Sequence, residues 1–281
     1  PLFFILSGYT YKIPKSLSDL KAQLKKDLKR LYFPCFLVAW LYEICVAIAN
    51  GTALNWLIVL KRLLWGNDNY TWGDLFFPGI GAVWFLSALF LAKLLYGFLQ
   101  LKGKDHEHIG FYLVLAYIGI LIGRKIWLPQ SLDIILIAVL FLHIGHLWKT
   151  KEALIQKYLI LLSSISAVVW LWPLEKGIYI ELAARQYPLG LICVLEAICA
   201  TFLIVQVTKM LEKFRIIKAV FVFFGQHTLE ILCIHCLDSI FFTWDSNDFI
   251  LRLLLNILIL IVYLLIKRSI YKLIHRCCCR Q

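Results

Sequence analysis

Four ionisable side chains fall within one short apolar stretch, residues 225–238 (GQHTLEILCIHCLD). His227 and Glu230 are three residues apart, as are His235 and Asp238, so each pair shares a face of a helix. A histidine beside a carboxylate suits proton transfer, because the carboxylate fixes the ring tautomer and raises its basicity. The same spacing suits a hydrogen-bonded pair that holds two helices together. Spacing alone favours neither interpretation.

The residues around this cluster indicate that it lies at membrane depth. Hydrophobic residues make up 62% of the chain and charged residues 16%, whereas soluble domains are roughly half apolar and about a quarter charged. A crossing needs about 20 mostly apolar residues, and its backbone must satisfy itself. The sequence predicts one all-α polytopic membrane domain, residues 1–281, with about nine of an expected ten helices: 1–11, 32–50, 84–101, 110–123, 131–148, 153–172, 188–208, 219–242 and 249–266.

The basic residues predict the orientation of these helices. If residues 1–11 run from outside to inside, the cytoplasmic loops hold 21 of the 29 Lys and Arg residues and the outer loops hold 6, while Lys93 and Arg252 lie within predicted spans. Lys and Arg beside a helix resist translocation, so this asymmetry places the C-terminus in the cytoplasm. The net charge of +12 then belongs to loops that face an anionic leaflet. The expected partner is a lipid bilayer, and no nucleic-acid partner is expected.

Two loops carry helical patterns of their own. Residues 17–31 (LSDLKAQLKKDLKRL) repeat leucine every three or four positions opposite a lysine-rich face, which predicts a helix lying on the inner leaflet. The outer loop 51–83 predicts a short interfacial helix, because Trp56 and Trp65 enclose several leucines. Cys233 and Cys236 lack the second pair of ligands that a metal site requires, so no metal is expected.

Five stretches, in order along the chain, resemble motifs of the acyltransferase-3 family of integral-membrane acyltransferases. Residues 1–9 (PLFFILSGY) resemble its "FF-x-x-SGY/F" helix, and residues 29–34 (KRLYFP) resemble its basic "KRLLIPY" segment. Residues 82–90 (AVWFLSALF) resemble "WFLxALF", and residues 140–147 (LFLHIGHL) resemble "FfxxGyll". Residues 225–235 (GQHTLEILCIH) resemble "GxxSLEIYxxH".

The resemblance implies transfer of an acyl group, usually acetyl from acetyl-CoA, to a hydroxyl of a cell-surface or lipid-linked carbohydrate. It implies a ten-helix protein in the inner membrane of a bacterium, with acyl-CoA as co-substrate and no tightly bound cofactor. In the family, a first helix carries the principal catalytic histidine, and nothing in residues 1–281 matches that helix. We therefore expect the chain to be truncated at its N-terminus.

The resemblance also suggests roles for residues of this chain. The donor carries phosphates, so Lys26, Lys29 and Arg30 are candidate donor-binding residues, as is Ser7 with its hydroxyl. Lipid anchoring is the alternative for the three basic residues, and helix packing is the alternative for Ser7.

His235 and Glu230 are the candidate catalytic residues, with His235 hydrogen-bonding the reacting groups and Glu230 orienting the site. Asp27 departs from the family, in which an R-x-x-R pattern usually places a basic residue at this position.

Two further functions stay open from the sequence. A transporter or flippase for a glycan or small solute would use buried His and Glu as proton relays. An inactive, truncated acyltransferase is the other alternative.

Overall fold

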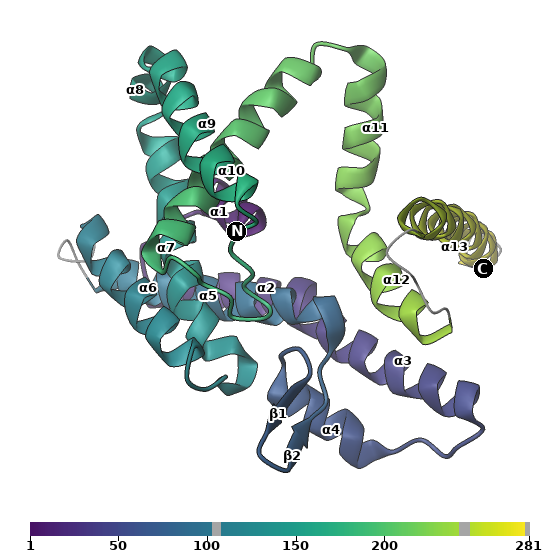
Figure 1. The fold of residues 1–281 in the computed structure, drawn as a ribbon. Helices are drawn as coiled ribbons and strands as arrows, with labels where there is room; N and C mark the ends of the chain where they lie inside the picture. Colours follow the sequence, from purple (N-terminus) through teal and green to yellow (C-terminus); the bar gives the residue numbers. More distant parts are fainter. Residues whose placement is uncertain (103–107, 242–247, 279–281) are drawn as a thin grey trace.

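The computed structural model describes residues 1–102, 108–241 and 248–278 (Figure 1). The helices are α1 (Leu2–Thr10), α2 (Leu17–Asp27), α3 (Phe33–Asn50), α4 (Trp56–Trp65), α5 (Trp84–Leu101), α6 (Ile109–Gly123), α7 (Leu132–Thr150), α8 (Glu152–Lys157), α9 (Leu159–Glu175), α10 (Leu191–Leu211), α11 (Arg215–Gln226), α12 (Thr228–Phe241) and α13 (Phe249–Cys278). Strands β1 (Tyr70–Trp72) and β2 (Leu75–Phe77) form an antiparallel hairpin. The predicted all-α helix bundle is confirmed, and the hairpin is an addition.

Within the described residues, five helical segments are long and apolar enough to cross a membrane: Leu17–Asn50, Gly81–Leu101, Pro129–Thr150, Leu191–Leu211 and Phe249–Ile270. They contain four of the nine predicted spans and overlap a fifth, 188–208, which confirms a multi-pass protein. Three other predicted spans are helical but short, since α1, α6 and α9 have 9, 15 and 17 residues. About 20 residues are needed for a full crossing.

The predicted span 219–242 is broken, and its last residue lies outside the described residues. The chain bends by 66° between helices α11 and α12. His227, between them, leaves the helical region at φ −111° and ψ 18°. Gly225 weakens the helix before the break, and the Thr228 hydroxyl donates to the Gly225 carbonyl at 2.8 Å, a local bond that competes with the helical ladder. The four ionisable groups therefore do not share one straight helix.

The basic helix α2 continues into α3 and is not a separate helix in the loop. Ser16 caps the start of α2, since its hydroxyl accepts a hydrogen bond from the Asp19 amide at 3.2 Å. A π-helical turn, Leu28–Tyr32, then joins α2 to α3. Leu20 is buried against α5, so part of the apolar face covers protein and not lipid. The predicted interfacial helix in the outer loop is present as α4.

Helix α7 forms the centre of the bundle and packs on α1, α5 and α6. Its crossing with α1 depends on two glycines. A Cβ atom at Gly8 would lie 2.0 Å from the Leu142 carbonyl oxygen, and one at Gly145 would lie 1.9 Å from the Ile5 carbonyl oxygen. His143 is buried in this core, stacked on Tyr112 at a centroid separation of 4.1 Å.

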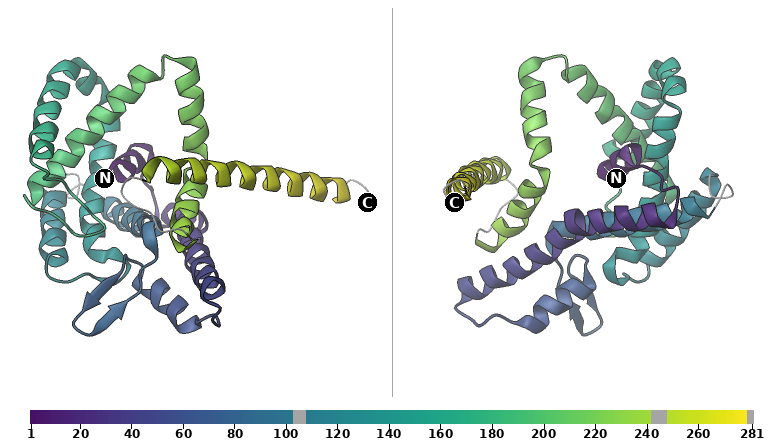
Figure 2. Two further views of the ribbon diagram at one scale, coloured as in Figure 1. Left: turned by 45° about the vertical axis from the view of Figure 1, so that its right-hand side comes forward. Right: turned by 180° about the vertical axis from the view of Figure 1, so that it is seen from behind.

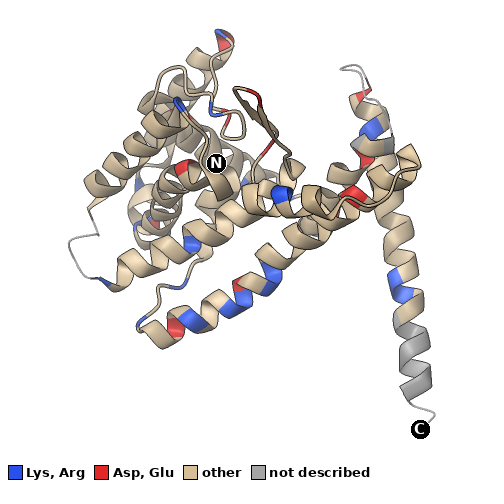
Figure 3. Ribbon diagram, turned by 90° about the horizontal axis from the view of Figure 1, so that it is seen from below, with Lys and Arg blue, Asp and Glu red and all other residues tan. Residues whose placement is uncertain are grey.

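The long helix from Leu17 to Asn50 runs from one end of the molecule toward the other, as Figures 1 and 2 show from three sides. We call the end that carries α2 the basic end, because Lys and Arg gather along that helix (Figure 3). The other end carries α4 and the β1–β2 hairpin, and we call it the hairpin end. Helix α13 contacts α12 and otherwise extends away from the body (Figure 2).

Candidate functional site

Both carboxylates of the α12 cluster bind α13. Asp238, whose side chain is fully buried, accepts hydrogen bonds from Arg252 at 2.7 and 2.8 Å and from Asn256 at 2.9 Å. Glu230 lies 3.4 Å from the Lys267 ammonium group. A bidentate arginine on a buried carboxylate is a strong charge-assisted contact. These contacts support the helix-packing interpretation for the two carboxylates.

The two histidines lie beyond hydrogen-bonding distance of the carboxylates three residues away. His227 Nδ1 is 3.7 Å from Glu230, and His235 Nδ1 is 3.9 Å from Asp238. His235 and Glu230 also face different surroundings. Glu230 lines an apolar groove between α3, α12 and α13, whereas the His235 side chain is 46% exposed and lines a polar cavity.

This polar cavity, at the hairpin end, has a volume of about 270 Å³. It lies where α3, α4 and the segment around the hairpin meet α12 and α13, and we call it the hairpin-end cavity. It is lined by Tyr42, Arg62, Asp68, Asn69, Gly79, Gly81, Ala82, His235, Cys236 and Arg252. Spacing in the sequence gave a signal for His235, and a lone cation in an apolar span gave one for Arg252. Nothing in the pattern pointed to Tyr42, Arg62, Asp68 or Asn69.

A second polar cavity, of about 250 Å³, lies at the basic end. It is lined by Ser7, Thr10, Tyr11, Lys12, Gln23, Lys26, Asp27 and Lys93. Ser7 comes from α1, Lys26 from α2 and Lys93 from α5, so this basic-end cavity brings together two of the four candidate donor-binding residues. It contains three lysines and one carboxylate, and an anionic ligand would suit it.

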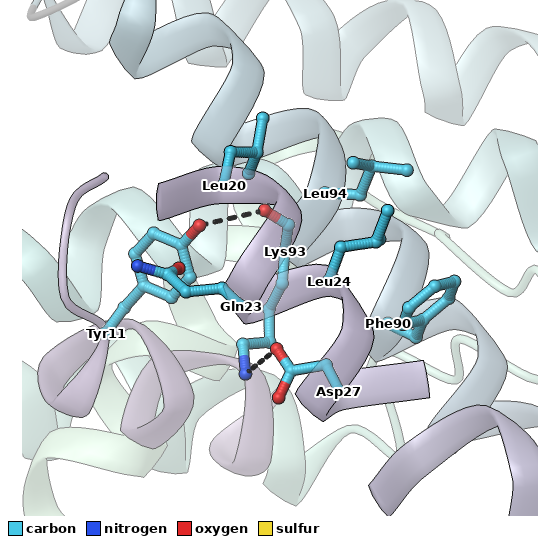
Figure 4. A pocket seen from close by; sticks show the side chains of 8 residues that line it. All are labelled: Tyr11, Leu20, Gln23, Leu24, Asp27, Phe90, Lys93 and Leu94. Atoms are coloured by element: carbon cyan, nitrogen blue, oxygen red, sulfur yellow. Dashed lines mark hydrogen bonds and ion pairs between the residues drawn. The ribbon is translucent and has the colours of Figure 1, made fainter. Parts of the chain in front are cut away.

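Lys93 and Asp27 form an ion pair in the wall of the basic-end cavity, with Lys93 Nζ 2.5 Å from the Asp27 carboxylate (Figure 4). The Tyr11 hydroxyl donates to the Lys93 carbonyl oxygen at 3.2 Å, which ties the end of α1 to α5. A lysine within an apolar span is costly unless it is paired. That cost was the only sequence signal for Lys93, and Asp27 is the partner that explains it.

The other two candidate donor-binding residues lie outside this cavity. Lys29 and Arg30 are both exposed in the π-helical turn after α2. Neither lines the basic-end cavity. Their position on the surface of the long helix suits the lipid-anchoring alternative.

A buried hydrogen-bond network holds the segments at the hairpin end together. Arg185 donates to Asp133 at 2.9 Å and to the Asn67 side chain at 2.7 Å, and its guanidinium lies 4.1 Å from the centre of the Trp127 ring. Asn67 also donates to the Leu128 carbonyl oxygen at 2.8 Å. Three loops distant in sequence are therefore joined beside the hairpin-end cavity, of which Asp68 and Asn69 form part.

The backbone around this network is strained. Gln130, Ser131 and Arg185 have φ values between 52° and 57°, a region that residues with a Cβ atom adopt at a cost of about 1–3 kcal/mol each. Burial, with a smaller contribution from the nearby Asp133 carboxylate, raises the pKa of Tyr187, which lies beside this network. The hairpin end is thus held in one arrangement by buried, specific contacts.

A family model described as an acyltransferase domain matches residues 1–266. The chain belongs to the acyltransferase-3 family. Searches of curated proteins and of solved structures each found no match.

Three of the five acyltransferase-3 motifs supply residues to the two cavities. Residues 1–9 supply Ser7 to the basic-end cavity, and residues 225–235 supply His235 to the hairpin-end cavity. Residues 82–90 lie between them, because Ala82 lines the hairpin-end cavity and α5 then runs on to Lys93. Residues 140–147 pack residues 1–9 into the core through Gly145. As an acyltransferase, the protein requires a site for an acyl donor and a site for an acceptor.

Proposed function

We propose that this acyltransferase moves an acetyl group from acetyl-CoA to a hydroxyl group of a cell-surface or lipid-linked carbohydrate. The basic-end cavity is the observation that carries the proposal. Lys12, Lys26 and Lys93 line it with the hydroxyl of Ser7. Ammonium groups bind phosphate as point charges, and coenzyme A carries several phosphate groups. Lys29 and Arg30 would then attract the donor from the surface before it enters.

The proposed orientation places the basic end in the cytoplasm, where acyl-CoA is available, and the hairpin end outside the inner membrane of a bacterium. The excess of Lys and Arg in the loops assigned to the cytoplasm supports this orientation. The C-terminus would then also be cytoplasmic. The donor and the carbohydrate would approach from opposite sides of the bilayer.

The two cavities lie at different depths along α5. Ala82, in the 3-10 turn just before α5, lines one cavity, and Lys93 on α5 lines the other. Eleven helical residues correspond to about 16 Å. The donor's phosphates would remain at the basic end while its flexible arm carries the thioester along the helix. Tight binding of the remote phosphates would in this way help to position the reacting thioester.

The reaction joins an acceptor oxygen to the acyl carbon and releases the coenzyme A thiolate. The hydroxyl loses its proton to a base, and the thiolate gains a proton as it leaves, so an ester and free coenzyme A are formed. We propose that His235 hydrogen-bonds the acceptor hydroxyl and raises its nucleophilicity. By family resemblance, the principal base is a histidine on a helix that nothing in residues 1–281 matches. We propose that Glu230 orients α12 through Lys267, which it approaches to 3.4 Å.

The test uses membranes that carry the full-length protein, incubated with acetyl-CoA labelled in the acetyl group. We expect label to enter a carbohydrate and to be released by mild alkali, as an ester requires. Membranes that lack the protein are the control. Normal protein abundance without any ester-linked label would overturn the proposal.

One observation favours the transporter alternative. Helices α11 and α12 form a broken apolar pair, a feature that many transporters use at their binding site. The same membranes, prepared as sealed vesicles, separate the two functions. Uptake of an unmodified glycan without acyl transfer would favour transport, whereas acyl transfer without uptake would favour the enzyme.

A further inference from the structure

The hairpin-end cavity contains two arginines, yet both have their charge neutralised by a carboxylate. Arg62 Nε lies 2.6 Å from Glu43, its terminal nitrogen donates to the Gly79 carbonyl oxygen, and its guanidinium stacks on Tyr42 at 4.6 Å. Its side chain is only 14% exposed. This arginine is fixed against α3 and is not presented to the cavity as a free cation.

Arg252 is neutralised in the same manner. Its Nε and one terminal nitrogen both bind Asp238, at 2.8 and 2.7 Å, and Asp238 is fully buried behind it. The same terminal nitrogen lies 3.4 Å from the His235 carbonyl oxygen. Arg62 and Arg252 therefore hold the walls of the cavity together.

Among the described residues of the lining, Asp68 is the carboxylate that forms no ion pair. Its carboxylate accepts a hydrogen bond from the Asn69 amide at 2.8 Å. Counting the two carboxylates behind the arginines, the cavity has three negative charges against two positive ones. The remaining lining groups are neutral and polar: the Tyr42 hydroxyl, the Asn69 amide, the His235 ring and backbone at Gly79 and Gly81.

This combination points to the chemical class of the acceptor. A sugar hydroxyl can both donate and accept a hydrogen bond. A carboxylate, an amide and an imidazole are therefore good partners for it. An acidic sugar or a phosphate would meet one excess negative charge and no unpaired cation among the described lining residues, so the cost of removing its charge from water would not be compensated. We propose that the hairpin-end cavity is the acceptor subsite and that it selects an uncharged sugar residue over an acidic one. This inference rests on the proposed acyltransferase function.

The experiment uses the full-length protein in membranes, labelled acetyl-CoA, and glycans extracted from the cells that make the protein. Anion exchange separates these glycans into a neutral and an acidic pool before incubation. We expect at least tenfold more label per sugar in the neutral pool. Equal or greater labelling of the acidic pool would overturn the inference and leave the proposed function intact. Labelling of neither pool would overturn the proposed function itself.

A pair of matched variants connects this selectivity to the cavity. Asp68→Asn removes the excess negative charge and keeps the side-chain oxygen that binds the Asn69 amide, so it preserves the fold. We expect it to raise labelling of the acidic pool at least threefold relative to the neutral pool. Asp74→Asn makes the same chemical change in the hairpin turn, outside the cavity lining, and should leave the ratio unchanged. If the two variants behave alike, the cavity is not the acceptor subsite.

Discussion

Lys93 on α5 lies 2.5 Å from Asp27 on α2, and the two charges close one wall of the basic-end cavity. The side chains are 20% and 16% exposed, so the pair is only partly screened by solvent. Asp27 is acidic where, by the family resemblance, a basic residue is usual. Lys93 on α5 supplies the positive charge instead. The basic character of the cavity is thus retained although the position on α2 has changed sign.

Exchanging these two charges should test the pair directly. We expect Asp27→Ala and Lys93→Ala each to lower the free energy of unfolding by about 1–3 kcal/mol, because each leaves a partly buried charge without its partner. The double variant Asp27→Lys with Lys93→Asp should recover at least half of the loss. Thermal unfolding in detergent measures all three. Additive losses without recovery would show that the two residues are not coupled.

The position of Lys26 predicts a larger role in donor binding than that of Arg30. We expect Lys26→Ala to raise the apparent donor KM about tenfold, equivalent to about 1.4 kcal/mol, and Arg30→Ala to raise it less. Lys21→Ala, on the same helix but outside the cavity lining, is the control. Initial rates at varied acetyl-CoA concentration give the comparison. A larger effect from Arg30→Ala would move the donor site to the surface of the π-helical turn.

His235 is expected to contribute to the chemical step. In the full-length enzyme, His235→Ala should lower acyl transfer at least tenfold, or about 1.4 kcal/mol of barrier, while the amount of protein in the membrane stays normal. His108→Ala, at the exposed start of α6, should have no effect. Retained activity in His235→Ala would leave this histidine with a structural role only.

We expect that neither Gly8 nor Gly145, at the crossing of α1 and α7, can be replaced by a residue with a side chain. Gly8→Ala would place a Cβ atom 2.0 Å from the Leu142 carbonyl oxygen, and backbone cannot move aside as a flexible side chain can. We expect a loss of about 1–3 kcal/mol or more of stability. Gly110→Ala, which meets nothing within 4 Å at the start of α6, should be neutral or stabilising. Heat-induced aggregation of membrane extracts gives the ranking.

The helical class and most of the spans were predictable, because hydropathy and charge act along the chain itself. The break at His227 was not, since an apolar stretch as long as 219–242 reads as one helix unless local bonds such as that of Thr228 interrupt it. Within the candidate site, the sequence indicated Ser7, Lys26 and His235. It could not show that Asp27 meets Lys93 or that Glu43 neutralises Arg62, because those contacts depend on how distant helices pack.

The Arg185 network has a consequence for how the protein is made. Asn67 and Asp133 leave the ribosome well before Arg185, the cation that both of them bind in the finished protein. Until residue 185 has been synthesised, the Asp133 carboxylate has either to stay in contact with water or to remain buried without its cationic partner. The three strained backbone positions around it can be stabilised only after that moment. The hairpin end therefore matures late during biogenesis, and an Arg185 variant should be recognised by membrane quality-control proteases before any loss of catalysis can be measured.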